Sequence, residues 1–267
     1  MELKQLDIKT TFLHGSLDEQ IFMAQPEGFI AKGNEDKVCL LKKSLYGLKQ
    51  SPRQWYLRFD EFMLKTGFKR SAYDSCVYIK WINGQVGVFL LLYVDDMLIA
   101  STNKQEIERL KHQLKTEFEM KDLGEAKRIL GMQISRNRRK KRMFISQGNY
   151  IKKVLERFSM SDAKSVTTPL AQHFKLSSSQ SPSTEVEKSE MSKVPYASAV
   201  GSLMYSMVCT RPDLAYAASL VSRFMANPGR AHWDAVKWVL RYMKGTSHYG
   251  LLFKESEGKQ QIIGYCD

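Results

Sequence analysis

Cysteine and histidine are scarce in this 267-residue sequence, which has four cysteines and five histidines. Cys39, Cys76, Cys209 and Cys266 lie far apart without paired spacing. They therefore support neither a disulfide framework nor a zinc ribbon, and a reducing compartment is favoured. The histidines are equally scattered, so any metal chemistry would depend on carboxylates.

Long apolar segments are also missing. The longest apolar run, 86–94, is under half of the ~20 residues that a membrane-spanning helix requires, and Gly87 interrupts it. Residues 1–10 contain no basic region followed by an apolar stretch, which excludes a signal peptide at this position. We therefore expect an intracellular protein, cytoplasmic or nuclear, with no membrane partner.

Acidic residues are the minority among the charged side chains. The sequence contains 41 Lys and Arg against 28 Asp and Glu, a net charge of +13. Its hydrophobic content of 43% and charged content of 26% are ordinary for a folded chain, which excludes a disordered or fibrous protein. The basic excess favours a polyanionic partner such as nucleic acid.

Hydrophobic periodicity predicts an α+β protein whose C-terminal half is helical. A strand with Leu6 and Ile8 on one face is followed by a turn at His14-Gly15 and a short second strand. Asn83-Gly84 and Asp95-Asp96 predict hairpin turns. The other predicted helices cover 41–65 and 150–158, and one more is capped at 101–103. Two or three helices are predicted within 196–243, with a break at 211–213 and a turn at 227–229. The other predicted strands cover 73–82, 85–93, 97–100, 128–135, 143–146 and 261–265.

Residues 177–193 contain almost no large apolar groups, which predicts a flexible linker. Trp55, Trp233 and Trp238 have helical spacing among apolar neighbours and are predicted to be core residues rather than stacking platforms.

Asp7 and the pair Asp95-Asp96 each lie where an apolar strand breaks or turns. Gathered carboxylates suit Mg²⁺, and two ions ~3.5–4 Å apart can activate an attacking hydroxyl and stabilise leaving pyrophosphate. Considered alone, an Asp-Asp pair more often forms a simple turn than a metal site. An isolated aspartate such as Asp7 is likewise more often a solvent-facing strand residue than a ligand. Strand alternation places Asp95 and Asp96 on opposite faces, so only one of them can share metal ions directly with Asp7.

The stretch LLLYVDDMLIA at 90–100 resembles the catalytic hairpin of reverse transcriptases. Further stretches are similar, in the same order, to motifs of the copia-type LTR-retrotransposon polymerases. They are LDIKTTFLHGSL at 6–17, SLYGLKQSPRQWY at 44–56, FEMKDLGEAKRILGMQI at 118–134, YASAVGSLMYSMVCTRPDLAYA at 196–217 and HWDAVKWVLRYMKGT at 232–246. This resemblance covers nearly the whole chain.

The resemblance implies a right-hand polymerase palm over 1–146 with truncated fingers, and a mostly helical thumb over 147–225. A connection over 226–257 and the first strand of a truncated ribonuclease H domain over 258–267 would follow, with Asp267 as its first catalytic acid. The family places basic residues that clamp the triphosphate upstream of the first aspartate. We therefore expect an internal slice of a larger Pol polyprotein that polymerises weakly by itself.

The resemblance also implies roles for individual acids. Asp7 and Asp95 would hold two Mg²⁺ ions, with Mn²⁺ as the alternative, and Asp96 would be a more peripheral carboxylate. Phe12, five residues after Asp7, stands where such polymerases carry an aromatic steric gate against a ribose 2′-hydroxyl. Without the resemblance, Phe12 would be interpreted as a core aromatic.

Further residues would contact the substrates. Gly47, Ser51 and Pro52 fit the family's Gly-x-x-x-Ser-Pro spacing, where bare backbone lets template and nucleotide approach. Tyr93 of the catalytic hairpin and the Leu130-Gly131 turn, which resembles the primer grip, would contact primer and template. The alternative for Leu130-Gly131 is an ordinary hairpin strand with a bulge.

Two basic features leave alternatives open. Lys121 or Lys127 would donate a proton to the leaving pyrophosphate. The alternative is that both are ordinary surface lysines, which are abundant. The basic run 136–142, which includes Arg138, Arg139 and Lys140, is a solvated hairpin tip, a phosphate contact or a nuclear-localisation signal.

The leading hypothesis is therefore a segment of an RNA-directed DNA polymerase that uses dNTPs, a primer–template and the remainder of a Pol polyprotein. The rival hypothesis is a basic nucleic-acid-binding remnant that keeps the fold without catalysis.

Overall fold

A computed structural model describes residues 1–30 and 32–255 of the chain. The chain divides into two compact units, Met1–Ala126 (unit 1) and Lys127–Asp267 (unit 2). Both units combine antiparallel strands with helices, which confirms the predicted α+β class. The palm, thumb and connection ranges remain predictions, and the predicted strand over 261–265 and Asp267 lie outside the described residues.

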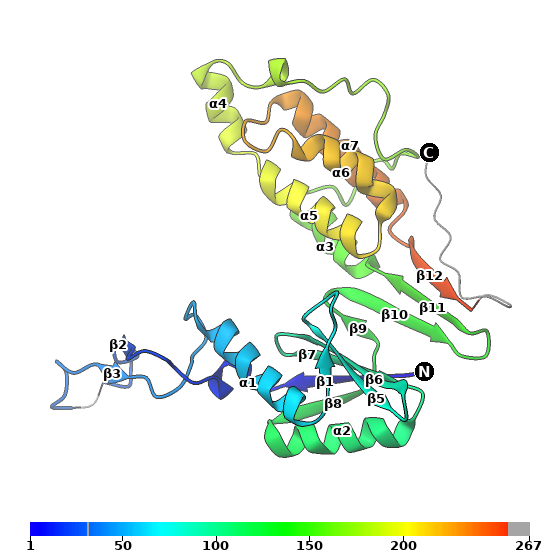
Figure 1. Ribbon diagram of the computed structural model, residues 1–267. Coiled ribbons are helices and arrows are strands. Elements are labelled where there is room, and N and C mark those ends of the chain that lie inside the picture. The colour runs from blue at the N-terminus through cyan, green and yellow to red at the C-terminus, as the bar shows by residue number, and fades with distance from the viewer. Residues whose placement is uncertain (31, 256–267) are drawn as a thin grey trace. The chain divides into compact units, whose positions relative to one another are not determined.

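Unit 1 is built on a six-stranded antiparallel sheet with strand order β4-β5-β6-β7-β1-β8 (Figure 1). Helices α1 and α2 share one apolar core with the inward side chains of these strands. The elements of unit 1 are β1 (Glu2–Ile8), the 3₁₀ turn η1 (Thr11–His14), β2 (Phe22–Met23), β3 (Cys39–Leu40), α1 (Ser51–Lys65), β4 (Lys69–Arg70), β5 (Val77–Ile82), β6 (Gln85–Tyr93), β7 (Asp96–Ser101), α2 (Lys104–Glu117) and β8 (Met120–Glu125).

Local signals predicted several of these elements correctly. Asn83-Gly84 joins β5 to β6 with both residues at positive φ, as a short hairpin requires. The side chain of Asn103 caps α2 by accepting a hydrogen bond from the backbone N–H of the second helical residue. Helix α1 begins at Ser51, later than predicted, because Pro52 lacks an N–H and fits only the first turn of a helix.

Between η1 and α1 the chain leaves the sheet as an arm that carries the short strand pair β2–β3 (Figure 1). The arm returns to the sheet through a loop whose Ser44 N–H donates to the carbonyl of Gly15 at 3.1 Å. This return delivers the second sequence motif, residues 44–56, to the end of β1.

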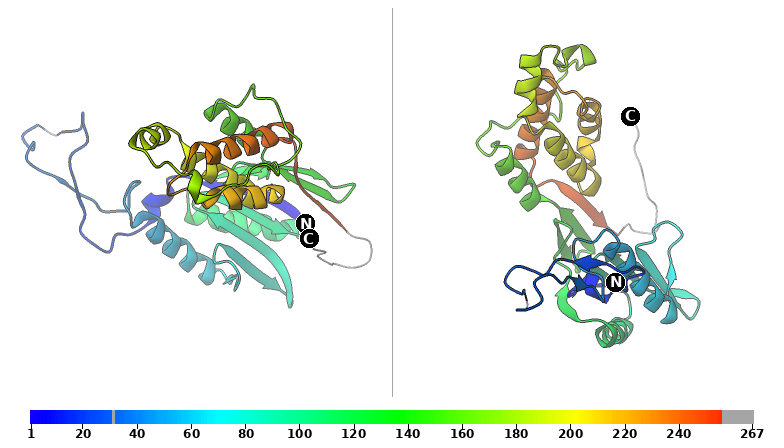
Figure 2. Two further views of the ribbon diagram at one scale, coloured as in Figure 1. Left: turned by 90° about the horizontal axis from the view of Figure 1, so that it is seen from above. Right: turned by 90° about the vertical axis from the view of Figure 1, so that its left-hand side faces the viewer.

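Unit 2 combines a four-stranded antiparallel sheet, ordered β12-β11-β10-β9, with helices that share a separate apolar core. Helices α5, α6 and α7 lie side by side in Figure 1 and in the two further views of Figure 2. The elements of unit 2 are β9 (Arg128–Ile129), β10 (Met132–Asn137), β11 (Arg142–Ser146), α3 (Gly148–Arg157), η2 (Ser178–Gln180), α4 (Glu185–Ser192), α5 (Tyr196–Cys209), η3 (Pro212–Leu214), α6 (Ala215–Ser222), α7 (Arg230–Gly245) and β12 (Gly250–Lys254).

The segment 177–193 is more ordered than its composition predicts. It contains η2 and the two-turn helix α4, which begins with a capping box. The Thr184 hydroxyl accepts from the Glu187 N–H at 3.2 Å, and the Glu187 carboxylate accepts from the Thr184 N–H at 3.1 Å. Residues 185–192 are therefore helical, and the flexibility of the linker over 177–193 remains a prediction. In the described residues, no helix combines the length and apolar character that crossing a bilayer requires.

Candidate active site

Asp7 and Asp96 are directly paired across the neighbouring strands β1 and β7. Residues paired in this way point to the same face of an antiparallel sheet. The next pair, Leu6 and Met97, is fully buried on the face covered by helices, so both carboxylates point to the opposite face. The side-chain amide of Gln5, on that same face, donates a hydrogen bond to Oδ1 of Asp96 at 3.4 Å.

Asp95 lies in the two-residue turn that joins β6 to β7. Its neighbour Val94 has φ 58°, a left-handed conformation that is costly for a β-branched residue. Two hydrogen bonds hold the turn in place. The indole Nε1–H of Trp55 donates to the carbonyl of Val94 at 2.8 Å, and the N–H of Ile8 donates to the carbonyl of Asp95 at 3.1 Å.

This geometry corrects the argument from strand alternation. Asp95 belongs to a turn, so alternation assigns its side chain no face, and the register places Asp96 rather than Asp95 opposite Asp7. The structure brings all three acids to the end of β1. Their separate roles as ligands of particular metal ions remain predictions.

The pKa of Asp96 is raised. Burial is the largest cause, the negative charges of Asp95 and Asp7 add to it, and the hydrogen bond from Gln5 opposes it. A nearby cation stabilises the ionised form of such a carboxylate, because the cation offsets the repulsion from the neighbouring negative charges. The electrostatics of the open sheet face thus favour a bound cation.

Lys121 lies opposite Asp7 on the other side of β1, in strand β8. Asp96, Asp7 and Lys121 therefore form a row across three adjacent strands. Of the two lysines that the sequence suggests as proton donors, Lys121 belongs to the same unit as the carboxylates, whereas Lys127 begins unit 2. The structure places Lys121 beside the acids.

The donor chemistry of this face fits Mg²⁺. Magnesium binds one or two protein carboxylates and completes its shell with water and phosphate oxygens. Among residues 1–30 and 32–255, no three His, Cys, Asp or Glu side chains converge into a ready-made metal centre. The three acids therefore suit an ion that substrate phosphates help to bind, rather than an ion enclosed by protein ligands.

Phe12 lies in η1, directly after β1, and is partly buried against the apolar core of unit 1. Its ring packs on that of Tyr46, with the centroids 4.6 Å apart. Phe12 also lines an apolar pocket of ≈ 200 Å³, and Pro52, Tyr93 and Val94 are among the other lining residues. The structure thus gathers residues that the sequence assigned separately to nucleotide and primer contacts.

The loop before α1 contains the first part of the second motif, residues 44–56, and its conformation accounts for the glycine and the serine of that motif. Gly47 has φ 97°, which side chains rarely adopt, while space around it is open, so the backbone alone requires glycine there. Ser51 is fully buried. Its hydroxyl accepts a hydrogen bond from the Ser44 hydroxyl at 2.6 Å and donates to the carbonyl of Leu45 at 2.5 Å. Ser51 therefore fixes the loop, and nucleotide contacts in this motif remain predictions.

The predicted primer and template contacts of unit 2 lie in two hairpin turns. Leu130 and Gly131 join β9 to β10, and residues 138–141 join β10 to β11. The second turn is exposed and ordered, because the side chain of Asn137 accepts from the Lys140 N–H at 3.0 Å. The solvated tip is thus confirmed as a turn, and its contact with phosphate remains a prediction.

Sequence reasoning missed two residues that support the site. The prediction of Trp55 as a core residue is confirmed, since it is 2% exposed, but its indole N–H also holds the Val94 turn. A buried tryptophan needs an acceptor for that N–H, which was an available signal. For Gln5, the signal was its position two residues before Asp7 on the same strand face.

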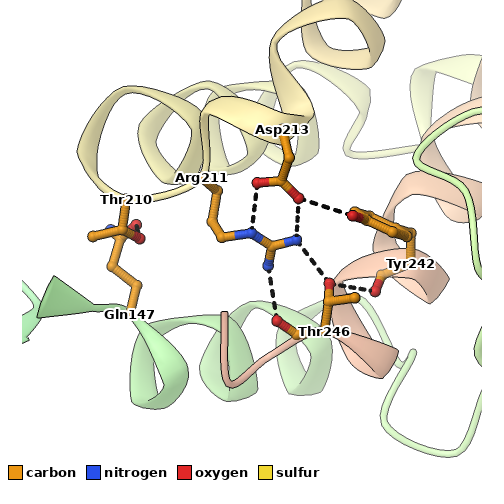
Figure 3. Close-up of polar contacts among 6 residues, drawn as sticks. All are labelled: Gln147, Thr210, Arg211, Asp213, Tyr242 and Thr246. Carbon is orange, nitrogen blue, oxygen red and sulfur yellow. Dashed lines mark hydrogen bonds and ion pairs between the residues drawn. The ribbon is translucent and has the colours of Figure 1, made fainter. Parts of the chain in front are cut away.

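A buried polar network in unit 2 also escaped the sequence analysis (Figure 3). Arg211 is fully buried. Its guanidinium donates to both carboxylate oxygens of Asp213, at 2.9 and 2.7 Å, and to the carbonyl and hydroxyl of Thr246, at 3.1 and 2.7 Å. The Tyr242 hydroxyl donates to the same carboxylate at 2.9 Å. These bonds tie the start of η3 to the end of α7.

Comparison with known proteins connects these features. Residues 1–172 match a family model described as reverse transcriptase (RNA-dependent DNA polymerase). The chain is 55% identical over all 267 residues to a retrovirus-related Pol polyprotein from transposon TNT 1-94 of Nicotiana tabacum, and matches 20% of that polyprotein.

Two further relatives extend the comparison. A Pol polyprotein from transposon RE1 of Arabidopsis thaliana is 38% identical over 253 residues, 95% of this chain and 17% of the relative. A transposon Ty5-1 protein of Saccharomyces cerevisiae is 31% identical over 262 residues, 98% of this chain and 82% of the relative. The chain thus spans a fifth or less of the length of the plant polyproteins.

Proposed function

Because the chain belongs to the reverse transcriptase family of retrotransposon Pol polyproteins, we propose that it extends a primer with deoxynucleotides on an RNA or DNA template. The observation that carries the proposal is the group of acids at the end of β1. Asp7 and Asp96 are paired across two strands, and Asp95 occupies the adjoining turn. The net charge of +13 suits polyanionic substrates.

Asp7, Asp95 and Asp96 would hold Mg²⁺, as two ions in the pattern of the family. When bound, these ions activate the attacking hydroxyl and neutralise charge that develops on the phosphates. The grouping of the acids supports this role, because the negative charges of Asp95 and Asp7 beside Asp96 favour a cation. The acids themselves position the ions, and the remaining ligand positions are left to water and substrate oxygens.

In the proposed reaction, the 3′-hydroxyl oxygen of the primer forms a bond to the α-phosphorus of the nucleotide while the bond to pyrophosphate breaks. The hydroxyl loses its proton to water, and pyrophosphate takes up a proton. Lys121 is suited to donate that proton, because its register places it beside Asp7 on the same sheet face. Positioning and charge neutralisation supply most of the catalysis in such a transfer.

Phe12 would select deoxynucleotides. Its ring is supported by Tyr46 and lies at the end of the strand that carries Asp7. A rigid ring at this position would clash with a ribose 2′-hydroxyl, which is the group that distinguishes RNA precursors from DNA precursors. Tyr46 therefore contributes by fixing the orientation of the gate.

Primer extension with Mg²⁺ tests the proposal. The assay uses the 267-residue chain and a chimera in which it replaces the matching stretch of the tobacco polyprotein. Asp95→Asn should abolish extension, whereas Asp36→Asn removes the same charge from the exposed arm and should leave it unchanged. Extension that survives Asp95→Asn would contradict the assignment of the site.

The rival function is nucleic-acid binding without synthesis, which the exposed basic tip at 138–140 favours. In that case both the chain and the chimera should bind a primer–template in a salt-dependent manner. Neither should extend it, under conditions in which a reverse transcriptase of known activity extends the same primer–template in parallel. This outcome would replace the polymerase proposal with the binding proposal.

A further inference from the structure

The turn between β9 and β10 places a leucine in a backbone conformation that leucine disfavours. Ile129 pairs with Met132, so the turn has two residues, Leu130 and Gly131. Both have positive φ, 48° and 72°, as in the hairpin turns where Asn-Gly is the preferred sequence. Leucine is disfavoured in this conformation because of its Cβ. Such a conformation persists only when the surroundings hold it.

Tyr205 of α5 holds this turn from outside the hairpin. Its hydroxyl donates a hydrogen bond to the carbonyl of Leu130, 75 residues away in sequence. The same hydroxyl would lie 3.9 Å from a Cβ placed on Gly131. The ring of Tyr205 is supported in turn by Tyr150 of α3, with the centroids 5.1 Å apart in an edge-to-face arrangement. Two helices of unit 2 thus fix a strained two-residue turn.

The contact adds little to the packed core of unit 2. Gly131 is exposed, and Tyr205 is itself 38% exposed. The buried face of α5 is formed by other residues, among them Val200 and Leu203. A strained turn that is half-buried at Leu130 and exposed at Gly131, and is held by a side chain at the margin of the core, indicates a functional constraint on the turn rather than a need of the fold.

We propose that Tyr205 is a positioning residue that aligns the 3′ end of the primer by fixing the Leu130-Gly131 turn. This inference rests on the proposed function and on the resemblance of the Leu130-Gly131 turn to the primer grip of such polymerases. Without the hydrogen bond from Tyr205, Leu130 relaxes toward ordinary backbone conformations, and the turn no longer presents one surface to the primer. Tyr205 acts through the turn and contacts no reacting atom.

Tyr205→Phe removes the hydroxyl and keeps the ring against Tyr150. Tyr216→Phe, on the exposed side of α6, is the matched control because Tyr216 is 74% exposed. Single-nucleotide incorporation by the chain and the chimera should show a burst rate about 2- to 10-fold lower for Tyr205→Phe, the range that the net value of one hydrogen bond gives. The burst amplitude, which counts folded active enzyme, and the KM for the nucleotide should not change.

Amide hydrogen exchange of residues 129–132 provides a readout that needs no catalysis. Exchange should accelerate in Tyr205→Phe and not in Tyr216→Phe. In the Tyr205→Phe background, Leu130→Asn should restore slow exchange, because asparagine tolerates the left-handed conformation that leucine resists.

The outcomes separate the two proposals. A burst rate and exchange that are unchanged in Tyr205→Phe, with wild type extending normally, would overturn the positioning role and leave the polymerase intact. A lower amplitude at an unchanged rate would also overturn it, since the residue would then serve stability alone. Exchange could also be faster in Tyr205→Phe while the wild type extends no primer, either as the 267-residue chain or in the chimera. That result would overturn both the proposed function and the positioning role that depends on it.

Discussion

Replacing Asp96 with asparagine should stabilise the metal-free protein, although it removes a proposed metal ligand. Cβ atoms of directly paired cross-strand residues lie about 4.5–5.5 Å apart, so the charges of Asp7 and Asp96 are roughly 6 Å apart. At that distance two like charges repel by ~0.7 kcal/mol in water and ~2.8 kcal/mol at an effective dielectric constant of ~20. Asp96 is half-buried, so we expect a gain of about 0.5–1.5 kcal/mol.

The Asn side chain keeps an acceptor for the amide of Gln5, so the substitution removes charge with little loss of hydrogen bonding. Urea unfolding in the presence of a chelator measures the free energy of unfolding at low and high salt. The gain should shrink in high salt, because salt screens the repulsion. Asp36→Asn, which removes a charge with no paired acid opposite it, should give no gain.

The pH dependence gives a second check. The folded-state pKa of Asp96 is raised, so the native state binds its proton more tightly than the unfolded state does. Stability of the wild type therefore increases as pH falls through that raised pKa. The gain in the free energy of unfolding from Asp96→Asn should be complete at neutral pH. It should disappear as the pH approaches the ordinary pKa of an aspartate.

Magnesium should reverse the order of stability, because a ligand that binds only the native state stabilises it in proportion to the logarithm of its concentration. The wild type should gain more from millimolar Mg²⁺ than Asp96→Asn does. Suppose that Asp96→Asn and Asp36→Asn change the free energy of unfolding equally under all these conditions. That result would refute the idea that repulsion between the paired acids destabilises the metal-free protein.

Three further predictions concern other parts of the chain. Arg211→Met should lower the free energy of unfolding by roughly 3 kcal/mol in urea titrations, because it breaks the ion pair between the buried Arg211 and Asp213. Arg157→Met, at an exposed position of α3, should change it by less than ~0.5 kcal/mol. Gly47→Ala should cost about 1–2 kcal/mol and lower the melting temperature, since φ is 97°. Alanine at 138–140 should reduce the slope of log K against log salt for primer–template binding by about one unit per lost phosphate contact; the same charge loss at the exposed positions 152, 153 and 157 should not.

Local chemistry made much of the fold predictable. The Asn83-Gly84 hairpin and the Asn103 cap follow from the conformations and hydrogen bonds that these residues prefer. Helix α4 escaped prediction because its segment is poor in apolar residues. It is specified instead by the reciprocal bonds of Thr184 and Glu187 and by the burial of Met191.

The candidate site was predictable by residue type and not by geometry. Asp7, Asp95 and Asp96 stand out because acids interrupt apolar strands and match a family motif. Their arrangement depends on the register of β1 against β7, which joins residues about 90 positions apart and has no local signature. The support of Val94 by Trp55, 39 residues away, is non-local in the same way.

The central position of β1 has a consequence for the synthesis of the protein. β1 lies between β7 and β8, and the hydrogen bond from Gln5 to Asp96 spans 91 residues. A ribosome that adds 5–20 residues per second needs about 5–20 s for that stretch, during which β1 lacks its partner strand β7. Such delayed pairing slows folding and exposes nascent apolar segments to aggregation and to chaperones. The strand that carries Asp7 is thus made well before the two strands that flank it, and its pairing is complete only when β8 has emerged.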